Sequence, residues 1–168
     1  AVADMTLVDN SYLTGDTRMK FSRRGMIDWT AVTRYTQNVV HDFDVRTTGV
    51  DALASSLSGG NLQKFIVGRE ILQGPQLLVV SQPTWGVDAG AAADIHRAIR
   101  SLAEAGSAIL IISQDLDEIL ALCDRVAVIS QGTLSRVQPI HDVTPEQIGL
   151  LMGIRHDSIA NEASRATT

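Results

Sequence analysis

A serine and two glycines stand directly before a helix-like segment, in residues 57–64, which read LSGGNLQK. Glycines let a backbone approach a ligand because no Cβ intervenes. A helix N-terminus offers unpaired N–H groups and partial positive charge, and Ser58 adds a hydroxyl at the same point. Together these groups suit a phosphate oxygen. The same residues also suit a plain serine N-cap after a tight turn, so this segment alone leaves both interpretations open.

An ordered series of further motifs follows this segment. The apolar run 77–80 leads into SQPT at 81–84, and Pro83 lies 25 residues after Ser58. WGVD follows at 85–88, then IISQD at 111–115, where Gln114 lies 31 residues after Pro83. In this order the segments resemble the signature, Walker B, D-loop and switch-histidine motifs of ATP-binding cassette (ABC) proteins. The Asn-x-Gln-Lys ending resembles the carboxy-terminal cassette of importers for simple sugars and nucleosides.

This resemblance spans nearly the whole chain and implies a fold, a function and a set of site residues. The implied fold is α/β, the distal half of a P-loop NTPase (RecA-like) cassette, with a parallel sheet flanked by helices and a mainly helical subdomain. The implied function is that of an ATP-binding subunit that couples ATP binding and hydrolysis to uptake of a sugar or nucleoside. By the family pattern the nucleotide-contacting residues are Ser58, Gly59, Gly60, Asn61, Gln63 and Asp88.

The resemblance also implies cofactors, partners and a location. ATP and Mg²⁺ are the expected cofactors of the full-length protein. A partner nucleotide-binding cassette would receive the signature motif of this chain at its own ATP site. Transmembrane permease subunits, and indirectly a solute-binding protein, complete the expected assembly. The subunit would then lie on the cytoplasmic face of the inner membrane, as a peripheral protein.

Three positions depart from the family pattern. The Walker B strand of the family ends in Asp-Glu, whereas this chain has Ser81 and Gln82, and Gln114 takes the place of the switch histidine. Serine is a poor substitute for a carboxylate ligand of Mg²⁺. Glutamine orients a water but cannot take its proton at neutral pH. We therefore expect no intact catalytic residue and no metal site in this chain.

The Walker A loop, Gly-x-x-x-x-Gly-Lys-Ser/Thr, is also absent from the sequence. The two lysines, Lys20 and Lys64, follow Met19 and Gln63, so neither completes such a loop. We therefore expect this chain to be the distal part of a cassette and to be inactive alone, and we expect the full-length protein to hydrolyse ATP.

Composition limits the alternatives. The chain has 168 residues, of which 45% are hydrophobic, and a formal net charge of −5. The negative charge argues against nucleic acid as a partner, which disfavours an ABC-type ATPase of DNA repair or chromosome maintenance. A degenerate, non-catalytic cassette that acts only as an interaction module stays open. The single cysteine, Cys123, makes no internal disulfide, which favours a reducing compartment.

The spacing of apolar residues, together with helix-capping and turn residues, predicts the elements that position these motifs. We expect helices over 5–13, after Asp28, from Ser58, after Asp88 and after Thr144, with an exposed loop over 14–24. Strands are expected at 77–80 and 108–112, in a parallel sheet covered on both faces. Segments 125–129 and 133–137 should pair across a Gln131-Gly132 turn.

The same reading divides the chain into three parts. Residues 1–74 are expected to form a helical signature subdomain, and residues 75–155 the distal part of the ATPase core. The polar residues 156–168 are expected to be a disordered tail.

Overall fold

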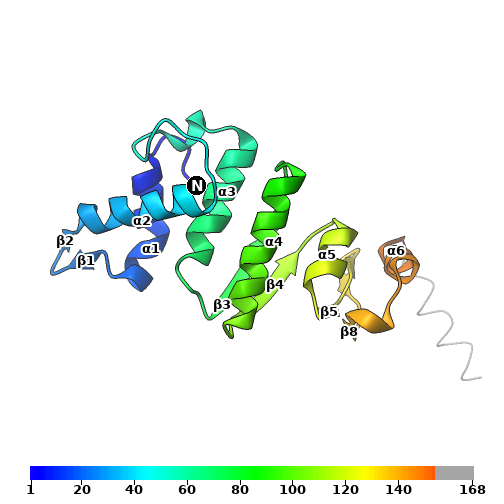
Figure 1. Ribbon diagram of the computed structural model, residues 1–168. Coiled ribbons are helices and arrows are strands. Elements are labelled where there is room, and N and C mark those ends of the chain that lie inside the picture. Colours follow the sequence, from blue (N-terminus) through cyan, green and yellow to red (C-terminus); the bar gives the residue numbers. More distant parts are fainter. Residues whose placement is uncertain (154–168) are drawn as a thin grey trace, which may run out of the picture. The chain divides into compact units, whose positions relative to one another are not determined.

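The computed structural model describes residues 1–153 of the chain. Its contacts divide the chain into two compact units, Ala1–Ser113 and the part from Gln114 onward. The first unit therefore holds both the helical segment and the first two long strands (Figure 1). The predicted division after residue 74 remains a prediction, and the predicted tail 156–168 lies outside the described residues.

Three helices build the first part of unit one: α1 (Leu7–Met19), α2 (Trp29–Asp42) and α3 (Gly59–Ile71), with a short 3₁₀ turn at Ala54–Ser56. They pack against one another, and the side chains fully buried among them include those of Leu7, Val32, Val39 and Phe65. The predicted N-cap of α2 is confirmed, because the Asp28 carboxylate accepts a hydrogen bond from the Ala31 N–H at 2.9 Å.

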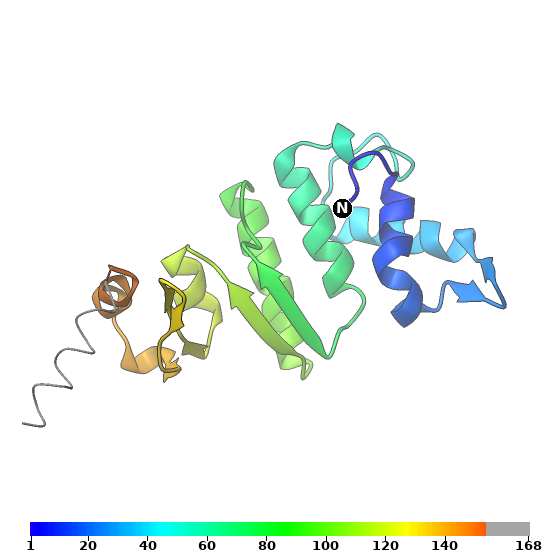
Figure 2. The same cartoon turned by 180° about the vertical axis from the view of Figure 1, so that it is seen from behind.

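The predicted loop over 14–24 is wrong in its first half. Helix α1 begins at a capping box of Thr6 and Asp9 and continues to Met19. A Cβ at Gly15 would lie 2.8 Å from the Phe21 ring, so this glycine gives the helix room to pack on Phe21. Gly15 therefore allows close packing within a helix, whereas in the sequence it favours a loop. Two short strands follow, β1 (Ser22–Arg23) and β2 (Met26–Ile27), which form an antiparallel hairpin (Figure 2).

The two predicted parallel strands are confirmed. Strand β3 (Leu77–Ser81) pairs with β4 (Ala108–Ile112) in parallel, from Leu77 opposite Ala108 to Ser81 opposite Ile112. Helix α4 (Ala89–Glu104) connects them and buries Ile95 and Ile99. A parallel pair needs such a crossover helix, and the N-cap predicted at Asp88 begins it.

Within the first unit, helices cover one face of this sheet, whereas the sequence predicts cover on both faces. Helices α3 and α4 contact the strands, and Leu78 is buried beneath them. The opposite face carries large apolar side chains that are about half exposed: Leu77 59%, Val79 56%, Leu110 52% and Ile112 49%. Apolar residues on both sides of a strand indicate two-sided burial. Within the first unit, residues 1–113, no element supplies the second cover.

The second unit contains α5 (Leu116–Leu122), four short strands and α6 (Pro145–Gly153), with a 3₁₀ turn at Ile140–Asp142. The predicted hairpin is confirmed but interrupted: β6 (Ile129–Ser130) pairs with β7 (Thr133–Leu134), and β5 (Arg125–Val126) with β8 (Gln138–Pro139). Gln131 and Gly132 both have positive φ, 48° and 78°, as a tight hairpin turn requires.

The predicted start of the last helix is also confirmed. The Thr144 N–H donates to Gln147 Oε1 at 2.9 Å and the Gln147 N–H to Thr144 Oγ1 at 3.3 Å, which is a capping box. None of the helices within residues 1–153 combines the length and apolarity that crossing a bilayer requires.

Candidate functional site

The motif of residues 57–64 forms the beginning of α3. Ser58 is the N-cap residue, in extended conformation, and the helix starts at Gly59. The Ser58 hydroxyl oxygen accepts from the Asn61 side-chain amide at 2.9 Å and, more weakly, from the Asn61 N–H at 3.5 Å. Both contacts use the oxygen as acceptor, so the Ser58 O–H proton is left for an outside acceptor. Ser58 and Gly59 are exposed.

The two glycines of the motif have different surroundings. A Cβ at Gly59 would meet nothing within 4 Å. A Cβ at Gly60 would lie 2.9 Å from the Gly86 carbonyl oxygen, closer than real Cβ contacts come. Gly60 is therefore required by close packing against the segment 85–88, whereas Gly59 faces open space. Of the two, only Gly59 has the open surroundings that the approach of a ligand needs.

This difference gives a testable prediction. Gly60→Ala is expected to lower the free energy of unfolding by about 1–3 kcal/mol, because the obstructing atom is a backbone oxygen that cannot turn away. Thermal unfolding of Gly60→Ala and of Gly59→Ala measures this loss of stability. Gly59→Ala is the matched control, and it should leave stability unchanged or raise it by a few tenths of a kcal/mol, as alanine in place of helical glycine does. Equal losses in both variants would contradict this assignment.

Asn61 holds the beginning of α3 to the preceding connection. Its Oδ1 accepts from the Arg46 N–H at 2.9 Å, while its amide nitrogen donates to Ser58. Both ends of the side chain are thus engaged within the protein. Asn61 consequently orients the Ser58 hydroxyl.

Gln63 ties the same helix to the end of strand β3. Its amide nitrogen donates to the Gln82 carbonyl at 2.9 Å and to the Pro83 carbonyl at 3.0 Å. Gln82 has a left-handed φ of 51° and its N–H donates to the Ile112 carbonyl at 2.8 Å. A non-glycine residue in this conformation persists where its surroundings hold it, and here Gln63 and Ile112 do so. These hydrogen bonds hold the beginning of α3 to the end of β3.

The positions predicted to correspond to Walker B and the switch histidine carry no carboxylate or imidazole. Ser81 ends β3 and is exposed, and Gln82 is half-buried. Gln114 is exposed at the first position of the second unit, directly before Asp115, the N-cap of α5. Among residues 1–153, no three His, Cys, Asp or Glu side chains gather where they could hold a metal ion.

Asp88 caps helix α4. Its carboxylate accepts from the Ala91 N–H at 2.9 Å, and this hydrogen bond is the main reason that the pKa of Asp88 is lowered, with the Lys64 charge contributing less. Lys64 itself donates to the Asp44 carbonyl at 3.0 Å and lies 3.4 Å from the Asp44 carboxylate. Asp88 thus remains an anion that accepts hydrogen bonds at neutral pH.

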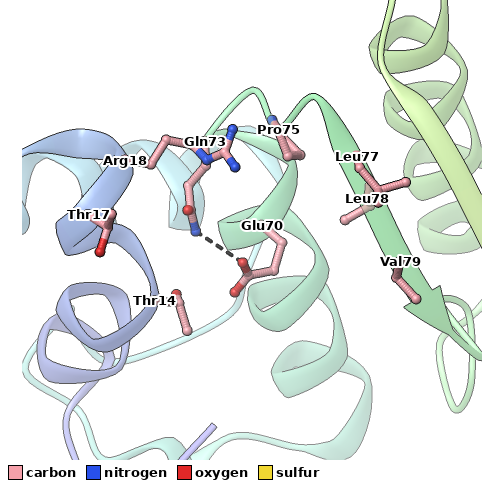
Figure 3. Close-up of a pocket in the computed structure, with 9 residues that line it drawn as sticks. All are labelled: Thr14, Thr17, Arg18, Glu70, Gln73, Pro75, Leu77, Leu78 and Val79. Atoms are coloured by element: carbon pink, nitrogen blue, oxygen red, sulfur yellow. Dashed lines mark hydrogen bonds between the residues drawn. The ribbon is translucent and has the colours of Figure 1, made fainter.

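A cavity of about 650 Å³ lies elsewhere in unit one, between α1, the end of α3 and β3 (Figure 3). Glu70 and Gln73 point into it and are joined by a hydrogen bond of 3.1 Å. No feature of the sequence pointed to this cavity. The contacts of Gly60 with Gly86 and of Asn61 with Arg46 were likewise missed, because each joins residues far apart in the chain.

Comparison with known proteins decides the family. No protein-family model matches the chain. It is 40% identical over 151 residues to the nucleoside import ATP-binding protein NupA of Lactococcus lactis, covering 90% of this chain and 30% of the relative. It is 35% identical to the guanosine import ATP-binding protein NupO of Bacillus subtilis, covering 98% of this chain and 32% of the relative. This chain belongs to the ABC import ATP-binding proteins.

A third ABC relative extends the range of solutes. The glucose import ATP-binding protein TsgD13 of Haloferax volcanii is 35% identical over 98% of this chain. The chain spans about a third of the length of the curated ABC relatives it matches. All these relatives are import proteins, and the alternative of a DNA-repair ATPase is not favoured.

Solved structures agree on the ABC cassette fold. The dimeric ATP-binding cassette MJ0796, in a post-hydrolysis state bound to ADP and Pi, superposes with a TM-score of 0.67 at 17% identity. The match covers 83% of this chain and 58% of that one. An ATP-binding subunit of an ABC transporter gives a TM-score of 0.67 over 98% of this chain. The predicted α/β cassette fold is thereby confirmed, while the roles assigned to single site residues stay predictions.

Proposed function

We propose that this chain is the signature-bearing portion of an ATP-binding subunit that couples ATP binding and hydrolysis to the uptake of a sugar or nucleoside. Residues 1–74 serve as the signature subdomain and residues 75–155 as part of the ATPase core. The signature completes the ATP site of a partner cassette. The site formed with Ser81, Gln82 and Gln114 does not hydrolyse ATP efficiently.

One observation carries this proposal: the exposed beginning of α3, where Ser58 and Gly59 face open space. The Ser58 O–H and the first N–H groups of the helix are hydrogen-bond donors, and the helix end adds partial positive charge. Such a donor set fits the γ-phosphate oxygens of ATP. Donors fixed in place before reaction stabilise the charge of phosphoryl transfer without reorganising.

The Walker B residues of this chain fit Mg²⁺ poorly. Mg²⁺ in nucleotide sites takes carboxylate oxygens together with substrate phosphates, and Ser81 and Gln82 supply none. Gln82 can orient a water molecule through its amide but cannot accept its proton at neutral pH. With no Walker A loop in its sequence, the chain by itself is not expected to hydrolyse ATP.

The proposed partners follow from the relatives and from the chain's charge. A dimeric cassette of the same fold supports a partner cassette. The import functions named for the relatives support permease subunits, an indirect solute-binding protein and a peripheral place on the cytoplasmic face of the inner membrane. The net charge of −5 makes nucleic acid an unsuitable partner.

Substitution of Gln82, at the predicted Walker B position, tests whether the site formed with this residue contributes to ATP hydrolysis. Gln82→Ala is expected to change steady-state ATP hydrolysis by the assembled transporter only a few-fold, because it removes no general base; base catalysis alone contributes about 10²–10⁴-fold. The Gln63 contacts use the Gln82 carbonyl, which the alanine variant keeps. A loss of a hundredfold or more would mean that this half is itself catalytic and would overturn the proposal.

A further inference from the structure

The connection between α1 and α2 carries a surface of mixed basic and apolar side chains. It comprises the last turn of α1, the β1–β2 hairpin and the first residue of α2. Six exposed residues define this surface, here named the hairpin tip: Met19, Lys20, Arg23, Arg24, Met26 and Trp29. The hairpin lies at the end of the helical segment away from β3 and β4 in both ribbon views (Figures 1 and 2).

Hairpin geometry brings basic and apolar residues to the same side. Arg24 and Gly25 have positive φ, 51° and 79°, and form the two-residue turn. Arg23 and Met26 are direct cross-strand partners, so their side chains leave the ribbon on one face. Met26 is 74% exposed, the highest value among the exposed large apolar side chains of the described residues.

The hairpin is held firmly against the helices. Phe21, directly before β1, is buried, and its carbonyl accepts from the Asp28 N–H at 2.8 Å. The hydroxyls of Tyr12 and Ser22 lie 3.1 Å apart, within hydrogen-bond distance. The Tyr12 and Trp29 rings are 5.5 Å apart between centroids. These contacts therefore anchor the backbone of the hairpin to α1 and α2.

The charge of the hairpin tip is opposite to that of the chain. The whole chain carries −5, yet three of its 14 basic residues lie between positions 20 and 24. Asp16 and Asp28 are the nearby acidic residues in sequence, and Asp28 is engaged as the N-cap of α2. Within residues 1–153, none of the three basic side chains of the tip joins an ion pair.

We propose that the hairpin tip binds the surface of an anionic lipid bilayer. Anionic headgroups attract Arg and Lys, while Trp and exposed apolar side chains settle at the boundary between headgroups and acyl chains. An acidic protein segment would pair with the charges but leave Met26 and Trp29 in water, so the bilayer suits the whole surface better. This goes beyond the proposed function, because the surface lies apart from the start of α3.

Vesicle sedimentation tests the proposal with the full chain. The chain is expected to bind vesicles of phosphatidylcholine with phosphatidylglycerol, to bind pure phosphatidylcholine far less, and to lose binding as salt rises. Each basic residue near an anionic surface strengthens binding about fivefold, so Arg23→Gln/Arg24→Gln should weaken it about 25-fold. Met26→Ser, which changes no charge, should also weaken it.

The control variant is Arg97→Gln/Arg100→Gln on α4, which makes the same change in net charge elsewhere and should retain binding. Thermal unfolding should be unchanged in the Arg23→Gln/Arg24→Gln variant, since both side chains are exposed. Equal losses in the two double variants would overturn the proposal. Equal binding to neutral and anionic vesicles would also overturn it. Such binding would point to the exposed apolar sheet face of Leu77 and Val79 as the surface that contacts the bilayer. Binding to a polyglutamate peptide without binding to anionic vesicles would assign the tip to an acidic protein segment and also overturn it.

Discussion

Gly59→Asp is expected to lower steady-state ATP hydrolysis by the assembled transporter at least a hundredfold, since loss of one preorganised donor costs about 3 kcal/mol. The new carboxylate would stand where the phosphate oxygens are proposed to approach, and like charges repel. The fold should tolerate the change, because a Cβ at Gly59 meets nothing within 4 Å. Aspartate in the first turn also interacts favourably with the helix dipole.

Two controls separate the effect of charge from the effect of shape at this position. Gly59→Ala adds only a methyl group, and Gly59→Asn matches aspartate in size without its charge. Activity should fall least for alanine and most for aspartate, with melting temperatures close to that of the unsubstituted protein. If aspartate and asparagine reduced activity equally, steric blockage would explain the loss and the proposed phosphate contact would lose its electrostatic support. An active Gly59→Asp transporter would contradict the signature role.

Phe65→Ala is expected to lower the free energy of unfolding of the first unit by about 3–5 kcal/mol, the usual cost of deleting a buried aromatic ring. Phe65 is fully buried in α3, and the Arg69 guanidinium lies over its ring, 5.6 Å from the centroid. Helix α3 packs against α1, α2 and α4. The space left by the deleted ring would therefore weaken the packing that holds α3 in place. Urea unfolding followed by tryptophan fluorescence measures the effect, because Trp29 and Trp85 both lie in this unit.

Val79→Ala is the matched control for the core substitution. Val79 is also apolar but 56% exposed, so its truncation should change stability by no more than about 0.5 kcal/mol. Phe65→Leu keeps most of the buried volume and should fall between the two. A loss of less than about 1 kcal/mol in Phe65→Ala would show that α3 is not held by this ring and would contradict the core described here.

Several features of this protein follow from the sequence by itself. Helix starts at Asp28, Asp88 and Thr144 were predictable because an N-cap depends on residues two or three positions away. The parallel strands were predictable because apolar runs separated by a capped helix allow few topologies. The order of the motif segments was enough to predict the family, which the relatives confirm. The placement of Ser81 and Gln82 at the catalytic positions of that family stays a prediction.

Only the tertiary structure decided what depends on residues distant in the chain. It separated Gly60, which packs against Gly86, from Gly59, which is open, although the sequence presents them as equal neighbours. It turned the Gln63 side chain to the carbonyls of Gln82 and Pro83, 19 and 20 positions away. It also extended α1 through Gly15 and left one sheet face exposed. Packing between distant segments is set by the whole fold, and local pattern carries no signal for it.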